Sequence, residues 1–138
     1  MTGLLRLRVV TPGGSLINEE VAAFTGRSDF GEFCILPEHR PILASLVAGR
    51  MIVEKTGGAK VLYALDRGFM EAGPDHVNVI TERCVPAEAL DKTAVSEELA
   101  QAESALKDLD PTSPEAKEAL DKFSWAEVRL SILENPVA

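Results

Sequence analysis

The spacing of apolar residues changes once along this chain, near residues 86–90. Before that point apolar and polar residues alternate, as in the run Leu-Arg-Leu-Arg-Val at residues 5–9. Alternation is the period of a strand with one face toward a core. After that point apolar residues recur at steps of three and four, the period of an amphipathic helix. The sequence therefore predicts a β domain at residues 1–86 and an α domain at residues 91–138.

Turn signals divide the β part into many short segments. Thr56-Gly57-Gly58 stands between two alternating runs, which predicts a β-hairpin. No long helical pattern occurs in residues 1–85. Many short strands with regular turns indicate a mainly β sandwich or a small barrel. The other turn signals are Pro12-Gly13-Gly14, Gly49, Gly68 and Gly73-Pro74.

Two apolar seams in the α part predict an antiparallel helical hairpin. Pro111 ends the first helix, and Ser113, Pro114 and Glu115 suit the N-cap and first turn of the second. Each helix carries one seam: Val95, Leu99, Ala102, Leu106 and Leu109 on the first, and Ala119, Phe123, Ala126, Leu130 and Leu133 on the second. A hairpin of this size is marginal alone, which suggests that it can detach from the β part and find other partners.

Charge and cysteine content exclude several classes of function. The net charge is −8, and residues 91–138 hold eleven acidic and five basic residues. Such a chain is a poor candidate for binding nucleic acid or an anionic membrane, since both need clustered Lys and Arg. Cys34 and Cys84 lack metal-type spacing, and we expect two buried thiols in a reducing compartment. No stretch is long enough to span a membrane, and the first strand, at 4–10, leaves no room for a targeting peptide, so a cytosolic protein is expected.

No arrangement of side chains indicates catalysis. The two histidines, His39 and His76, lie in different contexts, and no Ser/His/Asp or Cys/His set stands out. Glu19 and Glu20 are adjacent and would point to opposite sides of a strand. Residues 57–60 lack the spacing of a phosphate-binding loop. The sequence predicts no catalytic residue, no cofactor and no metal site.

Two prolines frame a charged tripeptide in the segment Gly31–Leu43, which reads Gly-Glu-Phe-Cys-Ile-Leu-Pro-Glu-His-Arg-Pro-Ile-Leu. Each proline removes a backbone donor and biases the preceding residue toward extended geometry. Residues 36–41 are therefore predicted to form a rigid, exposed corner between two strands. This corner would present Glu38, His39 and Arg40 to solvent.

Segment 31–43 resembles the signature Gly-x-x-Gly-Ile-Leu-Pro-x-His-x-Pro-Leu-Leu of the epsilon subunit of F-type ATP synthases. Residues 7–13 resemble the opening strand and turn of that family. Residues 68–71 and 77–80 resemble its Gly-Gly-Phe-x-Glu-Val and Val-Thr-Val-Leu strands, and the acidic hairpin follows at the expected position. These blocks span nearly the whole chain.

The resemblance implies a ten-stranded β-sandwich followed by the hairpin, and a non-catalytic rotor subunit of a proton-translocating ATP synthase. The sandwich would link the gamma subunit to the c-ring and couple rotation to ATP synthesis. The hairpin would fold on the sandwich or extend into the alpha/beta catalytic hexamer and inhibit hydrolysis. The ring-facing corner would carry Glu32, Glu38, His39 and Arg40. The assembly would lie on the cytoplasmic side of the bacterial inner membrane, peripheral to it.

Departures from the family pattern modify these expectations. Cys34 and Glu38 stand where glycines are common, so the local turn differs. Residues 66–67 are Asp-Arg where a small residue and glycine are usual. The first helix keeps Leu90-Asp91 of an ATP-sensing motif but lacks its arginine, which argues against direct ATP binding. Acidic residues outnumber Lys117, Lys122 and Arg129 in the second helix, so we expect weak or no inhibition of hydrolysis.

Two alternatives stay open at this point. One is a β-sandwich binding module whose helical tail serves oligomerisation. The other is a small barrel enzyme with an unrecognised site. The rotor subunit predicts a stable complex with an elongated partner, the binding module predicts self-association through the hairpin, and the enzyme predicts a concave pocket with perturbed titratable groups.

Overall fold

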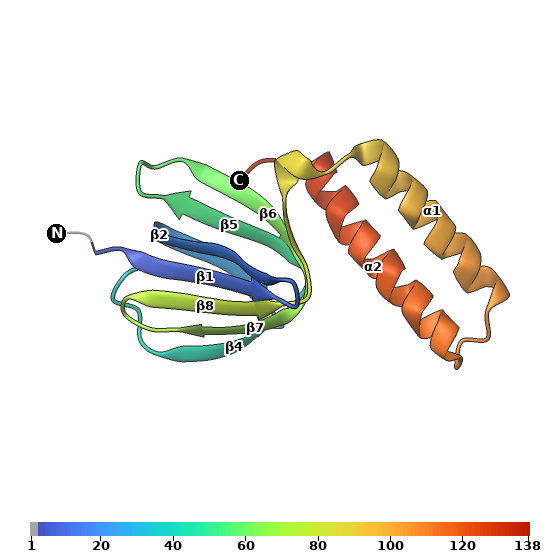
Figure 1. Cartoon of the computed structure of the whole chain (residues 1–138), viewed down its shortest axis with the longest axis horizontal. Coiled ribbons are helices and arrows are strands. Elements are labelled where there is room, and N and C mark those ends of the chain that lie inside the picture. The colour runs from blue at the N-terminus through green and yellow to red at the C-terminus, as the bar shows by residue number, and fades with distance from the viewer. Residues whose placement is uncertain (1–2) are drawn as a thin grey trace.

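The computed structural model describes residues 3–138, and Figure 1 shows a curved β-sheet with two antiparallel helices at one end. The strands are β1 (Leu5–Thr11), β2 (Gly14–Ser28), β3 (Gly31–Ile35), β4 (Ile42–Leu46), β5 (Gly49–Lys55), β6 (Lys60–Leu65), β7 (Gly68–Ala72), β8 (His76–Thr81) and β9 (Cys84–Pro86). A short 3-10 helix, Ala87–Ala89, leads to α1 (Lys92–Asp108) and α2 (Pro114–Glu134). The expected sandwich followed by a helical hairpin is confirmed, with nine strands in the described residues instead of about ten.

The strands form one sheet that folds over on itself through the long strand β2. The order is β4-β7-β8-β1-β2-β5-β6-β9, and β3 pairs with β2. Val21 of β2 pairs with Leu5 on one edge and with Lys55 on the other, so the two layers of the sandwich share this strand. β1 and β8 run parallel, with Leu7 opposite Val77. Every other pairing is antiparallel.

The core lies between the two layers and is built from the inward positions of alternating strands. Leu5, Leu7 and Val9 of β1 are fully buried, as the alternation predicts. Met51 and Val53 from β5 and Val77 from β8 join them in one cluster. Because side chains alternate between the faces of a strand, the residues between these positions form the outer surface.

The predicted β-hairpin turn and the predicted N-cap of the second helix are present, and the first helix is capped as well. β5 and β6 are joined through Thr56-Gly57-Gly58, where Gly58 has a φ of 94° and the N–H of Lys55 donates to the carbonyl oxygen of Ala59. Ser113 caps α2 by accepting from the N–H of Ala116. Asp91 caps α1 in the same way, accepting from the N–H of Thr93.

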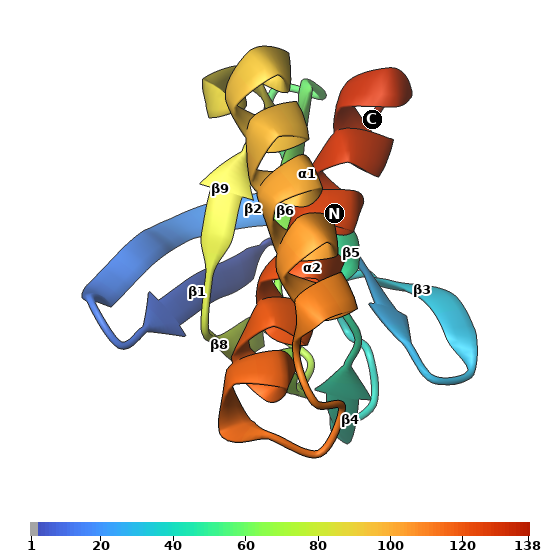
Figure 2. The ribbon, with the colours of Figure 1, turned by 90° about the vertical axis from the view of Figure 1, so that its right-hand side faces the viewer.

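Helix α2 has two apolar faces, which corrects the expectation of one seam per helix. Its first face, with Ala119 and Ala126 buried, packs against α1. Its second face places Trp125 and Ile132 on the outer surface of β5 and β6, where they meet Leu62 and Ala64 together with Ile52 and Val85. Figure 2 views this end of the molecule and shows the two helices lying over the sheet. Strand β6 is thus covered on both faces, by the sandwich core and by α2.

The cysteines also differ from expectation. Cys34 is exposed and Cys84 is half-buried, and both are free thiols. Cys34 lies on the outer face of β3 because its neighbours Phe33 and Ile35 occupy the inward positions. Burial against the core raises the pKa of the Cys84 thiol to about 12.

Candidate functional site: the corner, the open face and the charged cluster

The segment 36–41 forms the expected corner between β3 and β4. The N–H of Glu38 donates to the carbonyl oxygen of Pro74 at 2.7 Å, and the N–H of His39 donates to that of Leu36 at 3.2 Å. Glu38 has a φ of 70°, so it adopts the left-handed conformation that glycine takes most easily. Its side chain and that of Arg40 are exposed, and His39 Nδ1 lies 2.7 Å from the carbonyl oxygen of Arg40. The backbone is held, and the charged side chains are free to contact a partner.

The fourth residue expected at this corner is elsewhere. Glu32 lies near the start of β3, opposite Arg27 of β2, whereas the corner follows the other end of that strand. Cys34 pairs regularly with Thr25 and needs no glycine-like backbone. Of the two departures from the family's glycines, only Glu38 takes a positive φ.

A cluster of ionisable groups lies beside the corner, at the turn between β7 and β8. His76 Nε2 lies 2.7 Å from Glu71 Oε2, and His76 Nδ1 lies 2.9 Å from Asp75 Oδ1. The hydrogen bond with Asp75 is the largest cause of a raised His76 pKa, and the hydrogen bond with Glu71 is the second largest. The same two hydrogen bonds lower the pKa values of the Asp75 and Glu71 carboxyl groups. Asn78 also donates to Glu71. This cluster could not be predicted from the sequence, because the turn that joins its members is not a recognised motif.

The outer face of β4, β7, β8 and β1 carries a row of exposed apolar side chains, which we call the open face: Leu43, Phe69, Ile80 and Val10. Phe69 is opposite Ile80, and Ile80 is opposite Val10, so these three side chains are neighbours across three strands. Phe69 is 66% exposed, Ile80 64% and Leu43 80%. Leu43, Phe69 and Ile80 line a common surface depression. Met70, the next residue of β7, is buried in the core, whereas Phe69 faces outward.

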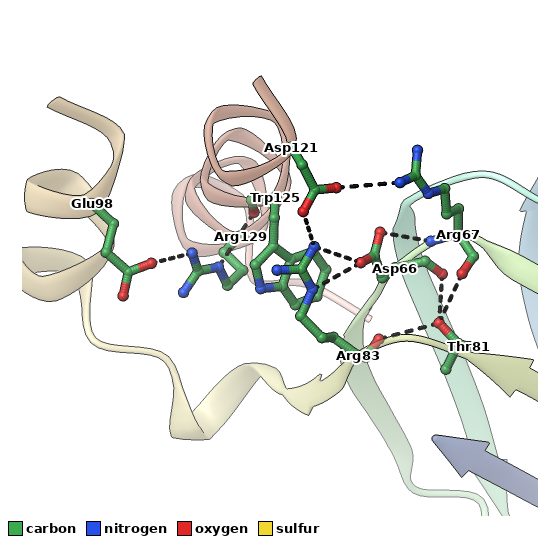
Figure 3. Close-up of polar contacts among 8 residues, drawn as sticks. All are labelled: Asp66, Arg67, Thr81, Arg83, Glu98, Asp121, Trp125 and Arg129. Atoms are coloured by element: carbon green, nitrogen blue, oxygen red, sulfur yellow. Dashed lines mark hydrogen bonds and ion pairs between the residues drawn. The ribbon is translucent and has the colours of Figure 1, made fainter. Parts of the chain in front are cut away.

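A second set of charges joins the hairpin to the sandwich, and we call it the charged cluster: Asp66, Arg67, Arg83 and Asp121, with Trp125 beside them (Figure 3). Arg83 Nη2 lies 2.8 Å from Asp66 Oδ2 and 3.0 Å from Asp121 Oδ2. Arg67 Nη2 lies 3.4 Å from Asp121 Oδ1. Of the two residues that are unusual for the family, Arg67 pairs with Asp121 of α2 directly, and Asp66 is connected to it through Arg83.

Residues 3–138 contain no group of three or more His, Cys, Asp or Glu side chains placed to hold a metal ion. Within the same range, every buried side-chain nitrogen and oxygen has a hydrogen-bond partner. None of the described helices has the length and apolar character needed to cross a bilayer.

This fold, a β-sandwich with a helical hairpin folded against it, is that of a known protein family. Residues 4–87 match the family model described as the ATP synthase, Delta/Epsilon chain, beta-sandwich domain. The chain belongs to the ATP synthase delta/epsilon family. It is 33% identical over 132 residues to the ATP synthase epsilon chain of Geobacter sulfurreducens, covering 96% of this chain and 95% of that one. It is 37% identical over 111 residues to the epsilon chain of Geotalea daltonii, covering 80% of each chain.

Two solved assemblies contain a chain of similar structure. A chain in the mitochondrial ATP synthase OSCP/F1/c-ring assembly of Euglena gracilis aligns with a TM-score of 0.72 and 26% identity, covering 97% of this chain and 79% of that one. A chain in the central stalk and c-ring of the Tetrahymena thermophila mitochondrial enzyme aligns with a TM-score of 0.61 over 92% of this chain and 94% of that one. At 13% identity the second match shows the fold alone.

Proposed function

We propose that this chain is a non-catalytic central-stalk subunit of a proton-translocating ATP synthase. It links the gamma subunit to the c-ring and couples ring rotation to ATP synthesis. Membership of the epsilon-chain family supports this proposal, as does the likeness to a chain of an F1/c-ring assembly. The observation that carries it is the open face, an apolar surface without a covering element among the described residues.

The open face suits the gamma subunit as a partner. The hairpin covers the outer surface of β5 and β6, whereas Phe69, Ile80 and Leu43 on the other layer stay solvent-exposed. A contiguous exposed apolar patch on a small protein marks an interaction surface, since burying it against a partner is favourable. Rigid strands hold the patch, so binding orders little additional chain.

Size exclusion of the full chain with a purified gamma subunit tests this assignment. We expect stoichiometric co-elution for the parent protein and its loss for Phe69→Asp, which places a charge at the centre of the open face. Phe30→Asp is the matched control, because Phe30 is fully exposed at the β2–β3 turn and is not part of the open face. Equal binding by both variants would remove the open face from the interface. Self-association without gamma binding would favour a binding module with a helical oligomerisation tail.

We assign the c-ring contact to the corner, with Glu38, His39 and Arg40 at its tip and Glu32 as an outlying candidate. Its backbone hydrogen bonds and two prolines support this role, because torque transfer needs a contact that does not deform. Replacing residues 38–40 by alanine in the assembled enzyme should reduce ATP-driven proton pumping while ATP hydrolysis persists. Glu32→Ala serves as a separate variant. Unchanged pumping in the triple variant would contradict the assignment.

The two parts act as separable domains, 1–86 and 91–138, on the cytoplasmic side of the bacterial inner membrane. Contact of the hairpin with the alpha/beta hexamer would be weak, since Lys122 is paired with Glu118 and Arg129 with Glu98. Direct ATP binding by the hairpin would also be weak. Arg83 and Arg129 line the groove between the helices, and both already have carboxylate partners. Isothermal titration of the full chain with ATP tests this point, and micromolar binding would contradict it.

A further inference from the structure

The imidazole ring of His76 contacts a carboxylate at each of its two nitrogens. Nε2 lies 2.7 Å from Oε2 of Glu71 on β7, and Nδ1 lies 2.9 Å from Oδ1 of Asp75 in the turn before β8. A neutral imidazole has one N–H group and one lone pair, whereas the imidazolium ion has two N–H groups. Because an ionised carboxylate only accepts hydrogen bonds, both contacts are satisfied together only when the ring carries its second proton. The arrangement is therefore that of a charged histidine.

The other charged groups near the ring have partners elsewhere. β8 lies between β7 and β1, and the residue of β1 opposite His76 is Arg6 (Figure 1). The Arg6 guanidinium contacts Asn18 and Glu20 of β2, and its N–H donates to the carbonyl oxygen of Asp75 at 2.9 Å. In the described part of the chain, none of the three charged or titratable residues of the corner is paired with the His76 ring: Glu38, His39 and Arg40. The two carboxylates therefore dominate the surroundings of the ring, and their hydrogen bonds, that of Asp75 first, raise the pKa of His76.

The turn that carries Asp75 also anchors the corner. The N–H of Gly73 donates to the carbonyl oxygen of His76 at 3.0 Å and closes the turn. The carbonyl oxygen of Pro74 accepts from the N–H of Glu38 at 2.7 Å. The His76 ring lies against the backbone of Gly73, where an added Cβ would be 2.7 Å from the ring carbon Cε1. The ring thus packs on the same short turn whose carbonyl group holds Glu38.

We propose that His76 is a positioning residue for the corner and acts in its charged form, so that a proton on the β7–β8 turn decides how firmly the corner is held. A ring that loses its second proton can donate to only one of the two carboxylates. Glu71 also accepts from Asn78, whereas the side chain of Asp75 is 86% exposed. Asp75 is therefore the contact that the neutral ring gives up.

Loss of the Asp75 contact reaches the corner through Pro74. The turn is then held by its backbone hydrogen bonds and no longer by the ring, so the Pro74 carbonyl group is less firmly placed. Its partner Glu38 has a φ of 70°, a conformation that is unfavourable for a residue with a Cβ. The corner therefore relaxes at Glu38 when this hydrogen bond weakens. Because the His76 pKa is raised, the corner is held below the ordinary value of 6.5 and is released as pH rises through the folded-state pKa.

NMR of the free full-length chain tests the positioning role without any partner. The titration of the His76 ring gives its pKa directly. The protection factor of the Glu38 amide, which corrects for the intrinsic effect of pH on exchange, reports on the Pro74 contact. From pH 5.5 to 9 we expect this factor to fall by about fivefold, the equivalent of one exposed ion pair, with a midpoint that follows the His76 titration. The Val47 amide, which donates to the carbonyl oxygen of Arg27 at 3.0 Å, is the internal reference and should stay constant.

His76→Gln should give a Glu38 amide with low protection at every pH, because a neutral side chain cannot donate to both carboxylates at once. His39→Gln is the matched control, since it removes the second of the two histidines and should keep the parent profile. Asp75→Asn leaves the ring in place, and it should lower the His76 pKa and reduce the change at Glu38. A pH-dependent Glu38 amide in His76→Gln would assign the effect to another group. Constant protection in the parent while His76 titrates would overturn the positioning role.

The consequence for proton pumping rests on the proposed contact of the corner with the c-ring, and the assembled enzyme tests it separately. The ratio of ATP-driven proton pumping to ATP hydrolysis should decline from pH 6 to pH 9 in the parent, and this decline should be absent in His76→Gln. If alanine at residues 38–40 leaves pumping unchanged while the free chain shows the expected profile, the c-ring contact is wrong and the positioning role stands. If the free chain lacks that profile, the positioning role is wrong whatever the pumping assay shows.

Discussion

Glu38 donates its backbone N–H to the carbonyl oxygen of Pro74 and has a φ of 70°, the one positive φ among the described non-glycine residues. The contact joins the β3–β4 corner to the β7–β8 turn. It holds Glu38 in a conformation that costs a residue with a Cβ about 1–2 kcal/mol. The corner is therefore both rigid and strained.

Replacing Glu38 by glycine should relieve this strain. We expect Glu38→Gly to be more stable than Glu38→Ala by about 1 kcal/mol, since both lose the carboxylate and only alanine retains a Cβ. Urea unfolding of the two variants provides the comparison. Equal midpoints, or a more stable alanine variant, would show that the left-handed backbone is not strained here.

The cluster around His76 should make stability depend on pH. The raised pKa of His76 means that its contribution is complete below its ordinary value of 6.5 and is lost as pH rises through the folded-state pKa. The lowered pKa values of Glu71 and Asp75 mean that their contribution is complete above their ordinary values of 4.5 and 3.8 and is lost on acidification. All three groups contribute fully between about pH 4.5 and 6.5.

Replacing His76 by glutamine should therefore destabilise the chain most in that window, and less at pH 8 and at pH 3. Urea midpoints of His76→Gln and the parent across this range measure the difference. His39→Gln is the matched control, because the polar contact of its ring is to the carbonyl oxygen of Arg40 and not to a carboxylate. A His76→Gln effect that is constant from pH 3 to 8 would rule out the ionic contribution.

Gly68 is required by a close backbone approach. A Cβ at this position would lie 2.0 Å from the carbonyl oxygen of Ile80 and 3.0 Å from the Cα of Thr81, so β7 and β8 would have to separate. We expect Gly68→Ala to lower the free energy of unfolding by about 2–4 kcal/mol. Gly57→Ala, where no atom lies within 4 Å of the added carbon, should change it by less than about 1 kcal/mol. Similar denaturation midpoints for the two variants would contradict the packing argument.

Removing the hairpin should leave ATP hydrolysis nearly unchanged. Residues 115–134 carry more acidic than basic side chains, and Lys122 and Arg129 are already paired within the hairpin. Such an acidic surface gains little binding free energy against an acidic loop on a catalytic subunit, because like charges repel. ATPase activity of the assembled complex, with the full chain and with a chain ending at residue 90, measures the effect. A several-fold rise after truncation would show that the hairpin inhibits.

Local pattern was sufficient to predict the elements. Alternation identified the buried face of β1, and the Thr56-Gly57-Gly58 turn was found. Ser113 was recognised as a helix cap because capping depends on neighbouring residues. Pairing between distant strands was not predictable in this way. The parallel contact of β1 with β8, which brings Arg6 opposite His76, joins segments about seventy residues apart, and no local rule selects that register.

The candidate surfaces likewise differ in whether local sequence could predict them. The corner was predicted from its two prolines, since each restricts the backbone at its own position. The open face was not, because Phe69, Ile80 and Val10 come from three strands and become neighbours only in the sheet. Trp125 was missed for a related reason. Its face of α2 is apolar only in part, and its partners Arg83 and Leu62 are supplied by the sandwich.

By itself the sequence determined the two kinds of secondary structure, the place where one gives way to the other, the rigid corner, and the resemblance that led to the family. These features depend on the order of residues within a few turns of chain. Tertiary structure alone decided which side of the sandwich α2 covers, which apolar row stays open, and that Asp66, Arg83 and Asp121 form one cluster. Those outcomes depend on distances between residues far apart in the chain, which only the packing of the sheet and the hairpin establishes.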